Sequence, residues 1–342
     1  MNSKIWRLKR LNKELNGVGI IGIGSAVPEK ILTNADLEKM VDTSDEWITK
    51  RTGISERRIL DKDTPVYELG VKAAQKAIED AGITAEDIDL IIAATTSPDY
   101  LFPQMACLIQ AKIGAKKAAA FDLNAACSGF VYGLTVAQNF LLNGQYKYIL
   151  VIGCEGLSRM VDWEDRNTCV LFGDAAGAVV LGAVDNKYGI LSTHIGADGE
   201  MGNVLTMPCC YITEEDIKVR EHENKKVMWM DGQEVFKFAV KIMEQASLKV
   251  IEGANLSIED VNYVFPHQAN TRIIDGALKR LGMKSDKIHP IIQKYGNISS
   301  ASIPVALDEA VKEGKIKKGD NLVLVGFGGG LTWGSALIKW AK

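Results

Sequence analysis

Residues 81–92 read AGITAEDIDLII and residues 254–265 read ANLSIEDVNYVF, so polar and apolar positions correspond at an offset of 173 residues. The same offset aligns YILVIG at 148–153 with NLVLVG at 321–326. Apolar runs of this kind, rich in Ile, Leu and Val, are typical of parallel strands that are covered on both faces. The chain is therefore predicted to contain two copies of one α/β unit.

Helices are predicted around these strands in both copies. One pair precedes the first strand of each copy, at 66–80 and 235–252, and a second pair lies between the strands, at 129–142 and 302–313. Two such halves packed face to face form a layered α/β domain with a pseudo-two-fold axis. Equivalent strand ends meet near that axis, which is where a shared active site is expected.

We divide the chain accordingly into an extension at 1–17, a first half at 18–190 and a second half at 191–342. The extension is basic and polar and lacks the apolar stretch of a secretory signal. The charged segment 203–227 is expected to form a surface loop.

The composition excludes several classes of function. The 342 residues carry a formal net charge of −3, and no apolar run is long enough to span a bilayer. Neither wholesale nucleic-acid binding nor a membrane span is therefore expected. The six cysteines form no C-x-x-C pair, which indicates reduced thiols, no zinc site and a cytoplasmic protein.

Three strand ends carry residues suited to catalysis. Cys127, in DLNAACSGFVYGL at 122–134, stands at the predicted start of a helix, where the positive potential of the helix N-terminus lowers the pKa of a thiol. His267 directly follows a buried strand, and Asn297, in YGNISSASIPVAL at 295–307, opens the helix equivalent to the one after Cys127. A thiol, an imidazole and an amide predict acyl transfer through a cysteine, with hydrogen bonds to a developing enolate.

A glycine-rich segment, VGFGGGLTWGSAL at 325–337, follows the last buried strand. Consecutive glycines let backbone N–H groups approach a ligand, so this segment and the Cys127 N–H are expected to form an oxyanion hole. A dinucleotide site is not indicated, because the sequence has no G-x-G-x-x-G in a strand–helix unit followed by an acid about 20 residues later.

Seven motifs together resemble the β-ketoacyl-acyl-carrier-protein synthase III family, the condensing enzymes that initiate bacterial type II fatty-acid synthesis. In order they are TSDEWITKRTGISERR (43–58), DLNAACSGFVYGL (122–134), LFGDAAGAVVL (171–181), GQEVFKFAV (232–240), PHQANTRI (266–273), YGNISSASIP (295–304) and GFGGGLTWGSALI (326–338). The resemblance implies the α/β thiolase fold, with five layers, αβαβα, built from two pseudo-duplicated halves. It also implies a cytoplasmic bacterial homodimer.

The implied reaction is a decarboxylating condensation of an acyl-CoA primer with malonyl-acyl-carrier protein, through an acyl-cysteine. No cofactor or metal is implied, because acyl-CoA is a substrate. The nature of the primer, whether acetyl, branched or longer, stays open.

The resemblance also implies roles for residues of this chain. Cys127 matches the nucleophile, His267 and Asn297 match the pair that drives malonyl decarboxylation, and Gly329 matches the oxyanion-hole partner of Cys127. Coenzyme A contacts are implied for Trp47, Arg51, Arg166, Gly232, Ala269 and Asn270. Phe102 matches the residue that closes the partner's acyl pocket. An acidic carrier protein needs a basic landing site, and the matching residues are Lys237, Arg272, Lys279 and Arg280.

Three rival interpretations were weighed against this one. A same-fold acyltransferase or ketosynthase of secondary metabolism would keep Cys127 and His267 without needing a fatty-acid carrier. Thiolases use a second cysteine near the glycine-rich segment and hydroxymethylglutaryl synthases use a glutamate base, and neither residue stands in the motifs here. A non-catalytic acyl-carrier-binding partner is expected to have lost Cys127 or its partners.

Overall fold

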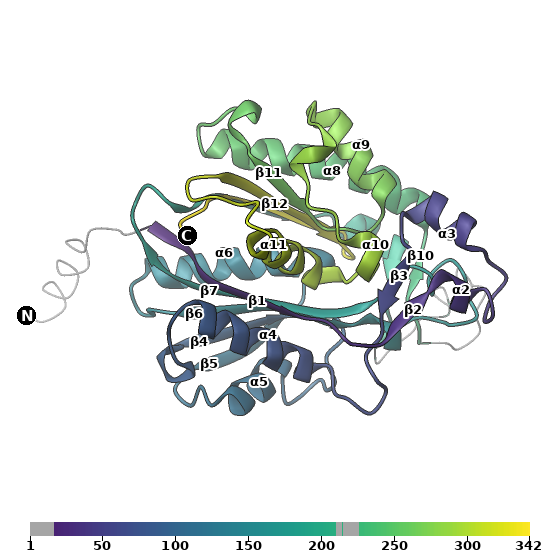
Figure 1. Ribbon diagram of the computed structural model, residues 1–342, viewed down its shortest axis with the longest axis horizontal. Helices are drawn as coiled ribbons and strands as arrows, with labels where there is room; N and C mark the ends of the chain where they lie inside the picture. The colour runs from purple at the N-terminus through teal and green to yellow at the C-terminus, as the bar shows by residue number, and fades with distance from the viewer. Residues whose placement is uncertain (1–16, 210–213, 215–225) are drawn as a thin grey trace, which may run out of the picture.

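Two mixed sheets form the frame of the protein, whose computed structural model describes residues 17–209, 214 and 226–342 (Figure 1). Across the first sheet the strands are β1 (Gly17–Ala26), β7 (Asp174–Val184), β6 (Ile149–Gly156), β4 (Leu90–Ala94) and β5 (Ala119–Leu123). Across the second they are β8 (Gly189–Ala197), β13 (Thr332–Lys339), β12 (Asn321–Gly328) and β11 (Tyr263–Pro266).

Helices cover both outer faces of this frame and fill the space between the sheets (Figure 1). The outer layer on the first sheet contains α4 (Tyr67–Asp80) and α5 (Met105–Ile113), and the outer layer on the second contains α8 (Gly232–Gly253) and α9 (Thr271–Leu281). The central layer contains α6 (Gly129–Leu142) and α11 (Ser302–Lys312). The predicted five-layered αβαβα thiolase fold is confirmed.

The internal repeat is present in the backbone conformation as well as in the sequence. Each central helix is preceded by a one-turn helix, η2 (Ala126–Ser128) before α6 and η7 (Ser299–Ala301) before α11. Both turns begin at a residue with positive φ, Ala126 at 46° and Ser299 at 45°. In each, an asparagine side-chain oxygen accepts from that residue's N–H, Asn124 from Ala126 at 3.1 Å and Asn297 from Ser299 at 2.9 Å. We call residues 124–129 the first elbow and residues 297–302 the second elbow.

The structure departs from the sequence-based expectations in three respects. The apolar runs do form parallel pairs, β4 with β6 and β11 with β12, but each sheet also contains antiparallel strands that the repeat did not predict. The repeat breaks down at β5 of the first sheet, because the equivalent part of the second half forms the short helix α10 (Ile292–Tyr295) and not a strand. Gly17, assigned to the extension, already belongs to β1.

Some expectations fall where the structure gives no description. Residues 1–16 of the predicted extension and residues 210–213 and 215–225 of the predicted surface loop lie outside the described residues. The division into halves at residue 190 stays a prediction, although β8 of the second sheet begins close by, at Gly189. None of the helices in the described part of the chain has the length and apolar character needed to cross a bilayer.

Candidate active site

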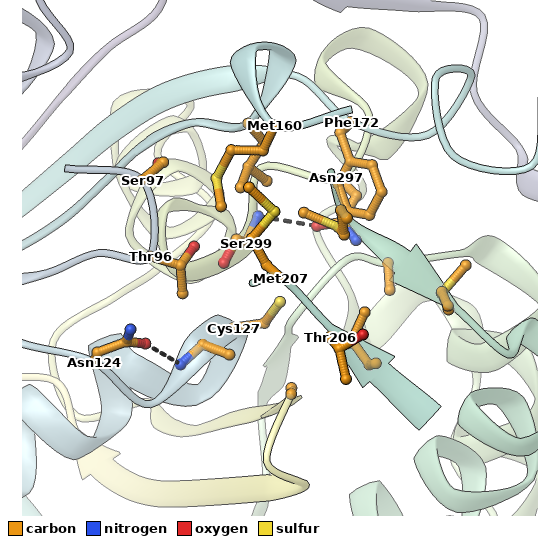
Figure 2. Close-up of a pocket in the computed structure, with 18 of the residues that line it drawn as sticks. Thr96, Ser97, Asn124, Cys127, Met160, Phe172, Thr206, Met207, Asn297 and Ser299 are labelled. Carbon is orange, nitrogen blue, oxygen red and sulfur yellow. Dashed lines mark hydrogen bonds between the residues drawn. The ribbon is translucent and has the colours of Figure 1, made fainter. Parts of the chain in front are cut away.

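Cys127 lies in the first elbow with its thiol directed into a cavity that Asn297 and Ser299 line from another wall (Figure 2). The residue is half-buried and is reached from that cavity. Burial of the sulfur raises the pKa of the Cys127 thiol to about 12, and the negative charge of Glu155 adds to the rise, while a hydrogen bond from Ser299 opposes it. The predicted lowering of this pKa is therefore wrong for the free protein: burial outweighs the potential of the helix N-terminus, and the resting thiol is protonated.

His267 directly follows β11 and is 1% exposed. Its backbone N–H donates to Val325 at 2.7 Å, and its ring Nδ1 lies 3.2 Å from the Ser302 hydroxyl. The ring also packs edge-on against Phe327, with centroids 5.3 Å apart. Burial lowers the pKa of His267 to about 3, so the imidazole is neutral. The site therefore holds a neutral imidazole together with a neutral thiol.

Asn297 is held by its backbone and presents its amide to the same cavity. Its N–H donates to Leu171 at 2.8 Å, and its carbonyl accepts from Gly173 at 3.0 Å. The side-chain oxygen is engaged by the Ser299 N–H at 2.9 Å. The side-chain NH2 group is therefore the part of this residue that is left to donate a hydrogen bond to a substrate oxygen.

The glycine-rich segment packs directly against the backbone of the nucleophile. A Cβ atom added at Gly328 would lie 2.5 Å from the Cys127 nitrogen, and one at Gly326 would lie 3.1 Å from the Cys127 carbonyl oxygen. Gly329, the residue proposed for the oxyanion hole, lines the same cavity. The sequence predicted that the segment 325–337 contributes to the oxyanion hole. Only the structure shows that Gly328 packs against the Cys127 nitrogen.

We expect Gly328→Ala to reduce the rate of Cys127 acylation by about 100-fold, the cost of disturbing one oxyanion-hole donor. The added methyl group would displace the Cys127 N–H, since the space beside Gly328 is filled by the first elbow. The rate is measured as the time course of acyl mass gain with an acyl-CoA. Gly199→Ala is the matched control, because a Cβ there meets nothing within 4 Å. Equal rates for the two variants would show that this contact does not matter.

Five of the six residues predicted to contact coenzyme A line two adjoining cavities, and Arg166 lines neither. The cavity that contains Cys127, His267 and Asn297 has a volume of about 940 Å³, and a second cavity of about 510 Å³ adjoins it. Gly232 and Asn270 line both cavities, and Ala269 lines the first.

The second cavity has an aromatic ring between basic side chains. Trp47 and Arg51 line the second cavity, and the Arg51 guanidinium lies 4.6 Å from the Trp47 ring centroid. The Arg166 guanidinium also approaches that ring, at 5.3 Å, while donating to the Asp42 carbonyl at 2.7 Å. An indole face beside two guanidinium groups is suited to stacking a flat heteroaromatic ring.

Phe102 is 81% exposed and does not line the cavity, although its neighbours Tyr100, 56% exposed, and Leu101, 63% exposed, do. Three large exposed apolar side chains in a row are typical of an interaction surface.

The four predicted docking residues are exposed on the outer helices α8 and α9. Two have acidic partners, since Lys237 lies 2.7 Å from Glu234 and Arg280 pairs with Glu244. These partners offset part of the positive charge.

Sequence reasoning missed two residues near the nucleophile. The Asn124 side chain accepts a hydrogen bond within the first elbow, as the Asn297 side chain does within the second. An alignment of NAACSG (124–129) with NISSAS (297–302) at the offset of 173 would have paired the two residues. Glu155, fully buried at the end of β6, affects the Cys127 thiol electrostatically. The sequence signal for Glu155 was a charged residue directly after the apolar run 148–154.

A five-layered fold with a cysteine, a histidine and an asparagine at one cavity defines the class of thiolase-fold condensing enzymes. Comparison with known proteins narrows the class. Models described as 3-oxoacyl-[acyl-carrier-protein (ACP)] synthase III match residues 121–199, and those for its C-terminal part match residues 251–340. The curated beta-ketoacyl-[acyl-carrier-protein] synthase III of Caldanaerobacter subterraneus subsp. tengcongensis is 54% identical over 324 residues, covering 95% of this chain and 98% of the relative.

Solved structures agree with this assignment. 3-Oxoacyl-[acyl-carrier-protein] synthase III from Aquifex aeolicus VF5 superposes with a TM-score of 0.88 at 48% identity, covering 95% of this chain and 100% of that one. The priming β-ketosynthase from the R1128 polyketide biosynthetic pathway also has a TM-score of 0.88, at 34% identity, covering 96% and 98%. This chain belongs to the β-ketoacyl-acyl-carrier-protein synthase III family.

Proposed function

We propose that this protein condenses an acyl-CoA primer with malonyl-acyl-carrier protein and so initiates fatty-acid synthesis. The products are 3-oxoacyl-acyl-carrier protein, coenzyme A and CO2. The observation that carries the proposal is the convergence of Cys127, His267 and Asn297 on one cavity, which adjoins the second cavity lined by Trp47 and Arg51. The proposed reaction calls for no resident cofactor, because a thiol, an imidazole and an amide suffice for each step.

In the first half-reaction the Cys127 sulfur attacks the thioester carbonyl of the acyl-CoA. The thiol proton must leave as the carbon–sulfur bond forms, and the neutral His267 imidazole in the same cavity is a suitable acceptor. The Cys127 and Gly329 N–H groups are proposed to stabilise the oxyanion. Coenzyme A departs as the thiol, and the acyl group stays on Cys127.

In the second half-reaction the malonyl thioester loses CO2 and leaves an enolate. Two neutral donors, the His267 ring and the Asn297 NH2 group, stabilise the negative charge on the thioester oxygen. A neutral imidazole acts as a donor through whichever ring nitrogen carries its hydrogen. The enolate carbon then attacks the acyl thioester, and the Cys127 sulfur leaves as a thiolate, which takes up a proton from water to restore the resting thiol.

The test is product analysis by mass spectrometry with purified protein, acyl-CoA and malonyl-carrier protein. We expect the carrier to gain the 3-oxoacyl mass only when both substrates are present. The likeness to a polyketide priming ketosynthase makes a secondary-metabolic carrier the second candidate acceptor. Preference for the carrier of a polyketide pathway over that of fatty-acid synthesis would favour that candidate.

We further propose that the exposed basic face of α8 and α9 binds the acidic carrier protein. Lys279→Glu is expected to raise the KM for malonyl-carrier protein about tenfold while leaving the KM for acyl-CoA unchanged, because like charges then oppose docking. Steady-state kinetics with each substrate varied measure this. Lys72→Glu, exposed on α4 in the opposite outer layer, is the matched control for total charge. A docking role for Lys279 is refuted if both variants raise that KM equally.

We also propose that the protein is a cytoplasmic homodimer, from its exposed apolar side chains and its free thiols. The exposed Tyr100, Leu101 and Phe102 side chains suit burial against a second copy, where Phe102 would close the partner's acyl pocket. Cys107, Cys127, Cys154 and Cys169 are free thiols, as expected in a reducing compartment.

A further inference from the structure

Glu155 is a fully buried carboxylate at the end of β6 that belongs to no part of the proposed chemistry. Its Oε1 accepts from the Ser299 hydroxyl at 2.9 Å and from the Ser300 hydroxyl at 2.8 Å. Its Oε2 accepts from Ser97, from the Thr96 N–H and hydroxyl, and from Thr95 at 2.6–3.4 Å. No basic side chain among the described residues pairs with it, so the charge is held by hydroxyl and amide donors alone.

The pseudo-two-fold repeat explains why this carboxylate stands beside the active site. The offset of 173 pairs Glu155 with Gly328 and Cys127 with Ser300. The first elbow thus packs against glycines of β12, whereas the second elbow packs against β6, where a Cβ added at Gly153 would lie 2.4 Å from the Ser300 carbonyl oxygen. Glu155 therefore occupies, at the second elbow, the place that Gly328 occupies next to the nucleophile.

Ser299 connects this buried carboxylate with the nucleophile. Its hydroxyl donates to Glu155 Oε1 at 2.9 Å, and Ser299 lines the cavity that contains Cys127, where a hydrogen bond from it lowers the pKa of the thiol. A hydroxyl has one hydrogen to donate, and a carboxylate only accepts. While Ser299 donates to Glu155, its oxygen is left to accept from the thiol hydrogen, and the hydroxyl stabilises a thiolate only when it turns away from the carboxylate.

We propose that Glu155 is a positioning residue for the Cys127 nucleophile, which holds the Ser299 hydroxyl toward itself and so keeps the resting thiol protonated and oriented. The carboxylate's own charge acts in the same direction, because it opposes a second negative charge nearby. The other titratable or charged residues that line the cavity of Cys127 are His267, which is neutral, Tyr100, Cys209, and Asp99 with Arg159, which pair with each other at 3.3 Å. The inference rests on the proposed role of Cys127 as nucleophile.

The test is the pH dependence of Cys127 alkylation by iodoacetamide, followed by intact-protein mass spectrometry on the full-length protein. Glu155→Gln is expected to shift the alkylation midpoint to lower pH and to raise the rate at pH 8 about tenfold, since one pKa unit changes the thiolate fraction tenfold. Ser299→Ala is expected to shift the midpoint to higher pH, because the donor available to the thiolate is lost. A purely structural role for Glu155 would lower thermal stability without moving the two midpoints in opposite directions.

Ser300→Ala is the matched control. It also removes a donor to Glu155, but Ser300 bonds the Ala94 carbonyl and is not a partner of the thiol. We expect it to leave the midpoint near that of the unaltered protein. If Glu155→Gln does not fold, Ser299→Ala and Ser300→Ala still decide the matter: equal midpoints for these two variants overturn the inference. Alkylation needs no acyl-CoA, so failure here is separate from failure of the proposed condensation.

Discussion

Replacing Cys127 by serine is expected to lower the overall condensation rate by about 10⁴-fold or more, the range seen when a covalent nucleophile is lost. Serine is close to cysteine in size, so the first elbow should keep its shape. A hydroxyl is a much weaker nucleophile than a thiol, and the neutral imidazole nearby must then remove a far less acidic proton. The measurement is release of free coenzyme A from acyl-CoA over time.

Cys107→Ser is the matched control for that experiment, because Cys107 is also a half-buried free thiol but lies on α5, away from the cavity. It should retain nearly full activity. A Cys127→Ser enzyme within tenfold of the unaltered protein would remove Cys127 from the proposed mechanism.

The second large effect is expected at the decarboxylation step. His267→Ala or Asn297→Ala should each slow CO2 release from malonyl-carrier protein by about 10²–10³-fold, since each removes one donor to the enolate oxygen. Acylation of Cys127 should be affected less, because the oxyanion hole for that step is made by backbone N–H groups. Labelled CO2 release and acyl mass gain measure the two steps separately.

His194→Ala and Asn143→Ala serve as controls of matching chemistry outside the cavity. Both should release CO2 at close to the unaltered rate. The division of roles is wrong if the variants at 267 and 297 block acylation while decarboxylation continues.

The architecture was predictable because the chain repeats itself. Matching apolar runs predicted the parallel cores of both sheets, and the central helix after Cys127 occupies the predicted residues Gly129–Leu142. The antiparallel strands were not predicted, because the repeat aligns only the apolar runs of the parallel strands, and some antiparallel pairs join strands far apart in the sequence. β1, for example, pairs with β7 more than 140 residues later.

The chemistry around Cys127 was only partly predictable. Cys127, His267 and Asn297 stand at equivalent strand and helix ends, so their convergence on one cavity could be expected, although their roles stay predictions. The raised pKa of the Cys127 thiol could not be expected from the sequence. It depends on burial of the sulfur and on Glu155, which folding brings next to the second elbow. The local sequence predicts that a helix starts beside the thiol. It does not predict how far the sulfur is shielded from water, because that depends on the whole fold.

The central claim is that the acyl group rests on Cys127 between the two half-reactions. Intact-protein mass spectrometry tests it most directly: the protein is incubated with a panel of acyl-CoAs, freed of excess ligand, and then exposed to malonyl-carrier protein. We predict a mass gain of one acyl group, absent in Cys127→Ser, that disappears on the second addition as 3-oxoacyl-carrier protein forms. The best-labelling acyl-CoA would identify the primer. No labelling by any acyl-CoA, or a label that malonyl-carrier protein does not consume, would contradict the account.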